Sequence, residues 1–291
     1  MSHEEFFIFR APSCRVLAQM ACGRGLGILL SCCLALVSLS ALSRDLQLPP
    51  DYKLVWADEF SIDGPPDPAK WGHDTQRNKL GWHNNELQYY SGPGQGNAQV
   101  QGGVLHIVAR QQSMALAADW GGQAYTSARL TTLGQAQWTY GFFEVRAKMP
   151  CGKGTWPAIW LLGSKGAWPG DGELDIMEHR GHTPQQTSSA VHVSAGHAGQ
   201  AVGGQAKVPD ACDQFHRYQM LWTPTEVVFG VDDFAHLRFP KMLGGAQIWP
   251  FDAPQFVILN LAIGGDLGGP VDNAIFPVGL QVDYVRVFQR N

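Results

Sequence analysis

The amino-acid sequence predicts an all-β protein built from two packed antiparallel sheets. Short runs with strand character recur along the chain, at residues 104–108, 143–147, 190–193, 226–229, 256–259 and 282–287. Glycine, proline, asparagine or aspartate separates these runs. No window repeats apolar residues at helical spacing over three turns behind a capping residue. Strands of this kind bury their apolar faces by packing sheet against sheet.

In chain order, the six runs read VLHIV, FEVRA, AVHV, EVVF, FVIL and VDYVRV. Several of them alternate apolar and polar residues, which is the pattern of a strand with one buried face. No repeat, low-complexity tract or linker interrupts the chain after about residue 50. We therefore expect one domain over residues 44–291.

The first 43 residues have a different character. Three arginines precede an uncharged apolar run at residues 25–39, which small residues follow. Because this run is shorter than the roughly 20 residues of a spanning helix, we expect a secretory signal peptide over residues 1–43 and no stable membrane insertion. Met20 is an alternative start, since it opens a more typical leader than Met1. Lipoprotein anchoring at Cys32 is a weaker alternative, because it would leave apolar residues on the mature end.

The mature chain is expected to be mildly acidic and extracellular or periplasmic. Removing residues 1–43 takes away three of the 21 basic and two of the 25 acidic residues, which leaves 18 against 23 and a net charge of −5. No cluster of lysine and arginine offers a surface for phosphates, which excludes nucleic acid as a partner. We expect a monomer.

Two of the six cysteines, Cys151 and Cys212, lie outside the predicted leader. In an oxidising compartment they can form one disulfide. Two unpaired thiols are the alternative, and the sequence does not separate the two because bridging depends on the Cα spacing.

The segment that carries chemistry is residues 168–178, WPGDGELDIME. Side chains alternate across a strand, so Glu173 and Asp175 share a face while Glu178 would point the other way. A β-bulge at Ile176-Met177 would reset the alternation and bring all three acids to one face.

Three carboxylates on one face repel one another, which raises the pKa of at least one of them. Glycoside hydrolysis uses such a set, because one carboxylate attacks the anomeric carbon while a protonated one serves the leaving oxygen. Acids on one strand suit the gap of about 5–5.5 Å that gives retention of configuration. Three acids also meet in a strand by chance, so the neighbouring motifs must decide.

Eight further motifs accompany ELDIME at residues 173–178. In chain order they are WADEF (56–60), NNELQYY (84–90), YTSAR (125–129), YGFFEVR (140–146), GTWPAIWLL (154–162), FHRY (215–218), LNLAIGG (259–265) and VDYVRV (282–287). In this order the motifs resemble glycoside hydrolase family 16, in the bulged form of laminarinase-like endo-β-1,3-glucanases, and ELDIME resembles the catalytic signature of that family.

The resemblance implies a β-jelly-roll sandwich with a concave substrate cleft, and hydrolysis of β-1,3- or mixed β-1,3-1,4-glucan by double displacement. It implies that Glu173 is the nucleophile, that Glu178 is the acid/base, and that Asp175 orients the nucleophile. Catalysis by such a pair requires no cofactor.

It also implies roles for residues around the acids. Trp156, Trp160 and, more weakly, Trp168 resemble residues that stack on sugar rings. Asn85 and Arg129 resemble residues that hydrogen-bond sugar hydroxyls, and His192 resembles a cleft histidine near the acid/base.

Each of these residues also has a purely structural explanation. The tryptophans could fill the core, Asn85 could cap a turn, Arg129 could pair with an acid, and His192 could be a satisfied core histidine.

Many relatives bind one calcium ion on the convex side, and Asp283 occupies the matching place for a ligand. One candidate oxygen ligand is thin support for a structural calcium site.

Two other functions stay open at this stage. One is a non-catalytic β-glucan-binding module, although such modules lose the catalytic carboxylates and this chain keeps all three. The other is a relative that acts on agarose or carrageenan, or that transfers glycosyl groups instead of hydrolysing.

Overall fold

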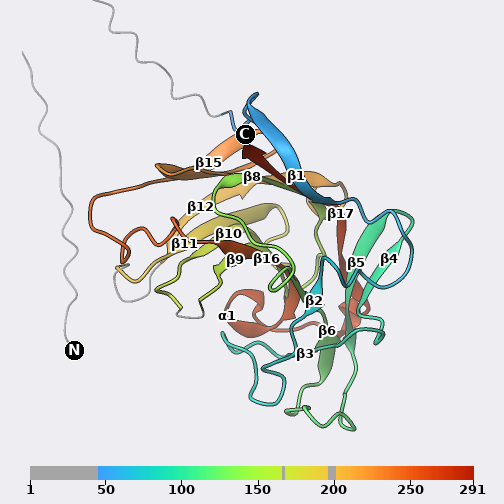
Figure 1. Ribbon diagram of the computed structural model, residues 1–291. Coiled ribbons are helices and arrows are strands. Elements are labelled where there is room, and N and C mark those ends of the chain that lie inside the picture. Colours follow the sequence, from blue (N-terminus) through green and yellow to red (C-terminus); the bar gives the residue numbers. More distant parts are fainter. Residues whose placement is uncertain (1–44, 166–167, 196–200) are drawn as a thin grey trace, which may run out of the picture. The chain divides into compact units, whose positions relative to one another are not determined.

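The computed structural model describes residues 45–165, 168–195 and 201–291 (Figure 1). These residues belong to one compact unit. The predicted signal peptide at 1–43 lies outside the described residues. In the part of the chain that the model describes, no helix combines the length and the apolar character needed to cross a membrane.

Ten strands form the first sheet, in the order β15-β14-β13-β8-β17-β5-β6-β3, with β1 paired to β17 and β4 paired to β5. The strands are β1 (Tyr52–Asp58), β3 (Gln88–Tyr90), β4 (Ala98–Gln101), β5 (Val104–Gln111), β6 (Tyr125–Ser127), β8 (Gly141–Lys148), β13 (His216–Trp222), β14 (Glu226–Val231), β15 (Phe234–Pro240) and β17 (Val278–Arg290).

Seven strands form the second sheet, in the order β12-β11-β10-β9-β16-β7-β2. They are β2 (Gly72–His73), β7 (Arg129–Thr131), β9 (Thr155–Gly163), β10 (Glu173–His179), β11 (Gln186–His192), β12 (Val202–Lys207) and β16 (Gln255–Ile263). The helix α1 (Gly265–Gly268) and the 3-10 turn η2 (Asn273–Ile275) follow β16.

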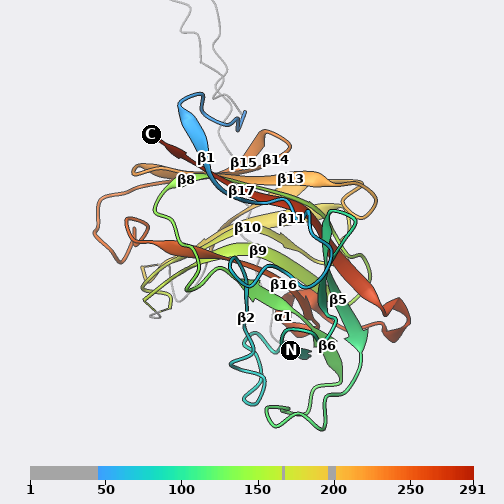
Figure 2. The ribbon, with the colours of Figure 1, turned by 45° about the vertical axis from the view of Figure 1, so that its right-hand side comes forward.

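The two sheets stack as the layers of a sandwich, with β8, β13 and β17 in one layer and β9, β10 and β16 in the other (Figure 2). Every strand pair of the described residues is antiparallel except β3 with β6. Alternate side chains from both layers meet in one apolar core, to which Ile107 of β5, Leu161 of β9 and Leu174 of β10 contribute. The all-β jelly-roll prediction is confirmed, and each predicted run falls on a strand, except that the run 190–193 extends one residue beyond the end of β11.

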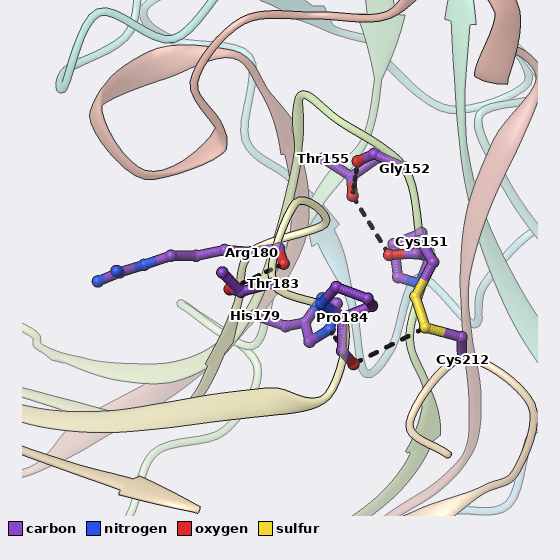
Figure 3. Close-up of a disulfide and its surroundings, with 9 residues drawn as sticks. Cys151, Gly152, Thr155, His179, Arg180, Thr183, Pro184 and Cys212 are labelled. Carbon is purple, nitrogen blue, oxygen red and sulfur yellow. Dashed lines mark hydrogen bonds between the residues drawn. A yellow bond between two sulfur atoms is a disulfide. The ribbon is translucent and has the colours of Figure 1, made fainter. Parts of the chain in front are cut away.

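A disulfide joins Cys151 and Cys212, whose Cα atoms are 5.8 Å apart (Figure 3). This distance lies in the ordinary range for a bridge, so the disulfide alternative holds and the free-thiol alternative does not. The bridge ties the β8–β9 connection to the segment before β13. It lies beside buried His179, the last residue of β10, whose Nε2 is 3.1 Å from the Pro184 carbonyl oxygen.

Candidate active site

The central feature of the site is an irregularity in β10. The pairing register of β10 shifts between Asp175 and Glu178 against β11, and between Asp175 and Met177 against β9. Ile176 and Met177 are both buried in the core, although they are consecutive in the strand. Because two neighbouring residues point inward, the alternation is reset and Glu178 returns to the outward side. The predicted β-bulge at Ile176-Met177 is present.

Four titratable side chains meet on this outward side. His192 of β11 lies directly opposite Glu173 in the register. Its Nε2 is 3.1 Å from Asp175 Oδ2 and 3.7 Å from Glu173 Oε1. Trp168, on the β9–β10 connection, donates its indole N–H to Glu173 Oε2 at 2.6 Å. Trp156 of β9 donates to Glu178 Oε1 at 3.1 Å.

Burial dominates the electrostatics of these carboxyl groups. Desolvation, followed by the charge of Asp175, raises the pKa of Glu173 from 4.5 to about 8, against the lowering effects of His192 and the Trp168 N–H. Desolvation and the Glu178 charge raise the pKa of Asp175 well above its ordinary value, and Asp175 is only 3% exposed. Desolvation also raises the pKa of Glu178. Burial and mutual repulsion therefore favour the protonated forms of these carboxyl groups, and acid catalysis requires a protonated group.

The three tryptophans that precede the acidic strand differ in exposure. Trp156 is 8% exposed and acts as a hydrogen-bond donor to Glu178, which leaves little of its ring open to a sugar. Trp160 is partly buried opposite Asp175. Trp168 is 57% exposed, so its ring face is open to a ligand beside Glu173.

Arg129 of β7 extends the site along the sheet. Its guanidinium lies over the rings of Trp160, at 4.7 Å, and Trp82, at 5.1 Å, and its Nε is 2.9 Å from Asp74 Oδ2. The carboxylate holds the cation between two aromatic surfaces. The expected residue is thus in the site, and Asp74 and Trp82 are partners that sequence reasoning missed.

Sequence reasoning also missed a hydrogen-bond network that holds Trp160 in place. The indole N–H of Trp160 donates to Asn260 Oδ1 at 2.8 Å, and Asn260 Nδ2 donates to the Tyr90 hydroxyl at 3.0 Å. Glu86 Oε2 accepts from Tyr90, at 3.4 Å, and from Gln88. The motifs NNELQYY and LNLAIGG contain these residues, but only the folded sheet shows that they form one network.

Asn85 lies at the edge of this group. Its backbone has φ of 58°, in the left-handed region that asparagine tolerates, and its Nδ2 donates to Asp266 Oδ1 of α1 at 2.7 Å. The side chain is exposed, and its hydrogen bond goes to Asp266 and not to one of the three acids. This bond joins the 83–87 turn to α1.

Asp283 lies on β17 in the other sheet, and its carboxylate pairs with the Arg146 guanidinium. A guanidinium in contact with the carboxylate is an unfavourable neighbour for a divalent cation. The environment of Asp283 therefore does not fit the calcium ligand that the sequence suggested.

Two other groups of described residues have donor atoms close enough to share a metal ion. One consists of Cys151, His179 and Cys212. The sulfur atoms of its two cysteines are joined in the disulfide. The other consists of Glu173, Asp175 and His192, which is the acidic cluster itself.

Comparison with known proteins agrees with this geometry. The model of the glycosyl hydrolases family 16 matches residues 85–284. A β-glucanase of Rhodothermus marinus is 46% identical over 254 residues, which cover 82% of this chain and 86% of the relative.

Solved structures with similar folds include other β-glucan hydrolases. SCLam, described as a non-specific endo-β-1,3(4)-glucanase, is 47% identical with a TM-score of 0.83, over 85% of this chain and 94% of that one. The laminarinase from Rhodothermus marinus is 46% identical with a TM-score of 0.76, over 82% and 97%.

Proposed function

Because the chain belongs to glycosyl hydrolase family 16, we propose that it is an endo-acting hydrolase of β-1,3-glucan or mixed-linkage β-1,3-1,4-glucan that retains anomeric configuration. The observation that carries the proposal is the β10 bulge, which turns Glu173, Asp175 and Glu178 to one accessible face.

In the proposed reaction, Glu173 attacks the anomeric carbon and Glu178 protonates the leaving oxygen. Asp175 is the most buried of the three acids, so it keeps its proton. A protonated Asp175 no longer repels the Glu173 carboxylate, which removes one of the two largest causes that raise the pKa of Glu173. Glu173 is then the member of the set that ionises and serves as nucleophile.

The second half-reaction follows from the same electrostatics. Esterification removes the charge of Glu173, so the pKa of Glu178 falls and its carboxylate can accept a proton from water. Water then displaces the sugar from Glu173. The steps use only carboxyl groups and water.

The substrate class rests on relatives with related sites. A mutant of SCLam, which was co-crystallised with 1,3-β-D-cellotriosyl-glucose, presents 1,3-β-D-cellobiosyl-glucose at its active site. A LamA variant from Zobellia galactanivorans, 35% identical to this chain with a TM-score of 0.74, was crystallised with laminaritriose and laminaritetraose. In this chain, Trp168 offers an open ring face beside Glu173 for a glucosyl unit.

Incubation of the purified protein with laminarin and with lichenan tests the proposal. We expect internal cleavage to oligosaccharides, and proton NMR at early times should show β-anomeric products. Glu173→Gln and Glu178→Gln should each lower kcat by at least about a thousandfold with the fold intact by circular dichroism. Near-normal turnover by either variant would contradict the assigned roles.

The same assay separates the competing functions. This chain is also 34% identical, over 190 residues, to a β-1,3-glucan-binding protein of Penaeus monodon. Tight laminarin binding with no product would assign this chain to the binding class. Cleavage of agarose or carrageenan but not of laminarin would show that the substrate is a different polymer from the one proposed. Products longer than the substrate would indicate glycosyl transfer.

We further propose that the protein acts as a monomer outside the cytoplasm. The Cys151–Cys212 disulfide supports an oxidising compartment.

A further inference from the structure

The bulge of β10 has a dedicated hydrogen-bond donor on the neighbouring strand. Ser189 of β11 is the residue that faces the two bulged residues, Ile176 and Met177. Its hydroxyl, in a residue that is 1% exposed, donates to the Ile176 carbonyl oxygen at 2.7 Å. A side chain thus satisfies a carbonyl group at the point where the ladder is interrupted.

Ser189 is in turn held by a histidine from the other sheet. His236 Nε2, on β15, lies 2.9 Å from Ser189 Oγ. Since the single hydroxyl proton of Ser189 goes to the carbonyl, His236 must donate from Nε2. Burial lowers the pKa of His236 to about 4, so the ring is neutral at neutral pH. The direction of both hydrogen bonds is therefore defined.

The approach of β15 depends on a glycine. Gly204 of β12 pairs with Ser189, and a Cβ atom there would lie 2.7 Å from Leu237 Cβ and 3.1 Å from the His236 carbonyl oxygen. The missing side chain lets the edge of the ten-stranded sheet close over β12, so that His236 reaches β11. Ser189, Gly204 and His236 together form one contact between the two sheets.

We propose that Ser189 and His236 are positioning residues that hold the β10 bulge and thereby keep Glu178 on the same side as Glu173. The inference rests on the proposed function, because it concerns the placement of the acid/base. Without the Ser189 hydroxyl, the Ile176 carbonyl loses its side-chain donor in the core, and the bulge can relax toward another pairing. A shift of Glu178 by a fraction of an ångström weakens proton delivery to the leaving oxygen.

The experiment compares two substrates with different needs for an acid. One is laminarin, and the other is a 2,4-dinitrophenyl β-laminaribioside, whose leaving group departs without protonation. For Ser189→Ala we expect kcat on laminarin to fall about tenfold or more with KM within about twofold, and a much smaller loss on the aryl glycoside. An equal loss on both substrates, or no loss on laminarin, would overturn the inference.

Further variants keep the test independent of folding. Ser189→Thr keeps the hydroxyl and should restore most of the laminarin activity. His236→Leu leaves the serine bond in place and should show a smaller loss with the same substrate dependence. The double variant of Ser189→Ala and His236→Leu should be no worse than Ser189→Ala alone, since both act through one carbonyl. Additive losses in the double variant would contradict a shared path.

Val191→Ala is the matched control, because Val191 is buried on the same strand and the same face without a polar group. It should lower the melting temperature but leave kcat on both substrates unchanged. Glu178→Gln separates the two proposals. If it stays active on laminarin, the proposed function fails. If it is inactive while Ser189→Ala is normal, only the present inference fails.

Discussion

Glu173 shows at the scale of a single residue how the site opposes stability. Burial raises its pKa from 4.5 to about 8, so the folded protein holds a proton that the unfolded chain has already lost in that pH window. The folded state therefore loses stability relative to the unfolded state as the pH rises from about 4.5 to about 8. A fold retains such a destabilising carboxyl group when the group takes part in catalysis.

A glutamine at this position should remove that loss. At pH 8 we expect the free energy of unfolding of Glu173→Gln to exceed that of wild type by on the order of 2 kcal/mol. Near pH 4 the two free energies of unfolding should be equal. Urea unfolding across the pH range measures this difference. Glu226→Gln, at a carboxylate on β14 that pairs with Arg238, is the control and should follow the wild-type profile. Parallel profiles for wild type and Glu173→Gln would contradict the expectation.

His192 acts on the same acids from the opposite strand. Its Coulombic interaction with these acids lowers the pKa of both Glu173 and Glu178. In His192→Asn we expect both limbs of the pH profile of kcat/KM to move to higher pH, because both carboxyl groups then hold their protons more tightly. His106→Asn, on β5 of the other sheet, should leave the profile in place. Movement of the limbs in opposite directions would be inconsistent with a shared electrostatic cause.

At the scale of elements, the acidic strand and its two neighbouring strands each supply different side chains to the site. β10 carries the acids, β11 supplies His192, and β9 supplies the indole donor of Trp156. The β9–β10 connection adds Trp168, which reaches Glu173 from a largely exposed position. A loop side chain can therefore tune the nucleophile without being part of the core.

The Trp168 indole N–H lowers the pKa of Glu173. Trp168→Phe keeps an aromatic face but removes the donor, so the acidic limb of the kcat/KM profile should move to higher pH with little change in melting temperature. Trp120→Phe removes an indole donor from a different loop and should leave the limb unchanged. An unshifted limb in Trp168→Phe would show that the N–H does not stabilise the Glu173 carboxylate.

At the scale of the whole molecule, the disulfide closes a loop of 61 residues that includes β9, β10, β11 and β12. The bridge constrains the unfolded chain more than it shapes the acids, which lie on the outward face of the sheet. Its contribution should therefore appear in stability and not in turnover.

We expect a variant with both Cys151→Ser and Cys212→Ser to lose about 2–5 kcal/mol of unfolding free energy. Its kcat on laminarin at 25 °C should stay within about twofold of wild type. Calorimetry and initial-rate assays measure the two quantities. Treatment with dithiothreitol should lower the melting temperature of wild type and leave the variant unchanged. An unaltered melting temperature in the variant would contradict a stabilising role.

The sequence alone determined the all-β sandwich, the acidic strand and the bulge. These features follow from local rules, because strand alternation has a period of two and the five-residue step from Glu173 to Glu178 violates it.

Only the tertiary structure decided which partners the site residues take. Asp74 pairs with Arg129, Asn260 holds Trp160, and Arg146 occupies the Asp283 carboxylate that the sequence suggested for calcium. The reason is physical: the contacts of a side chain depend on sheet register and on the approach of one sheet to the other. These bring together residues more than 50 positions apart in the chain, and no local pattern records them.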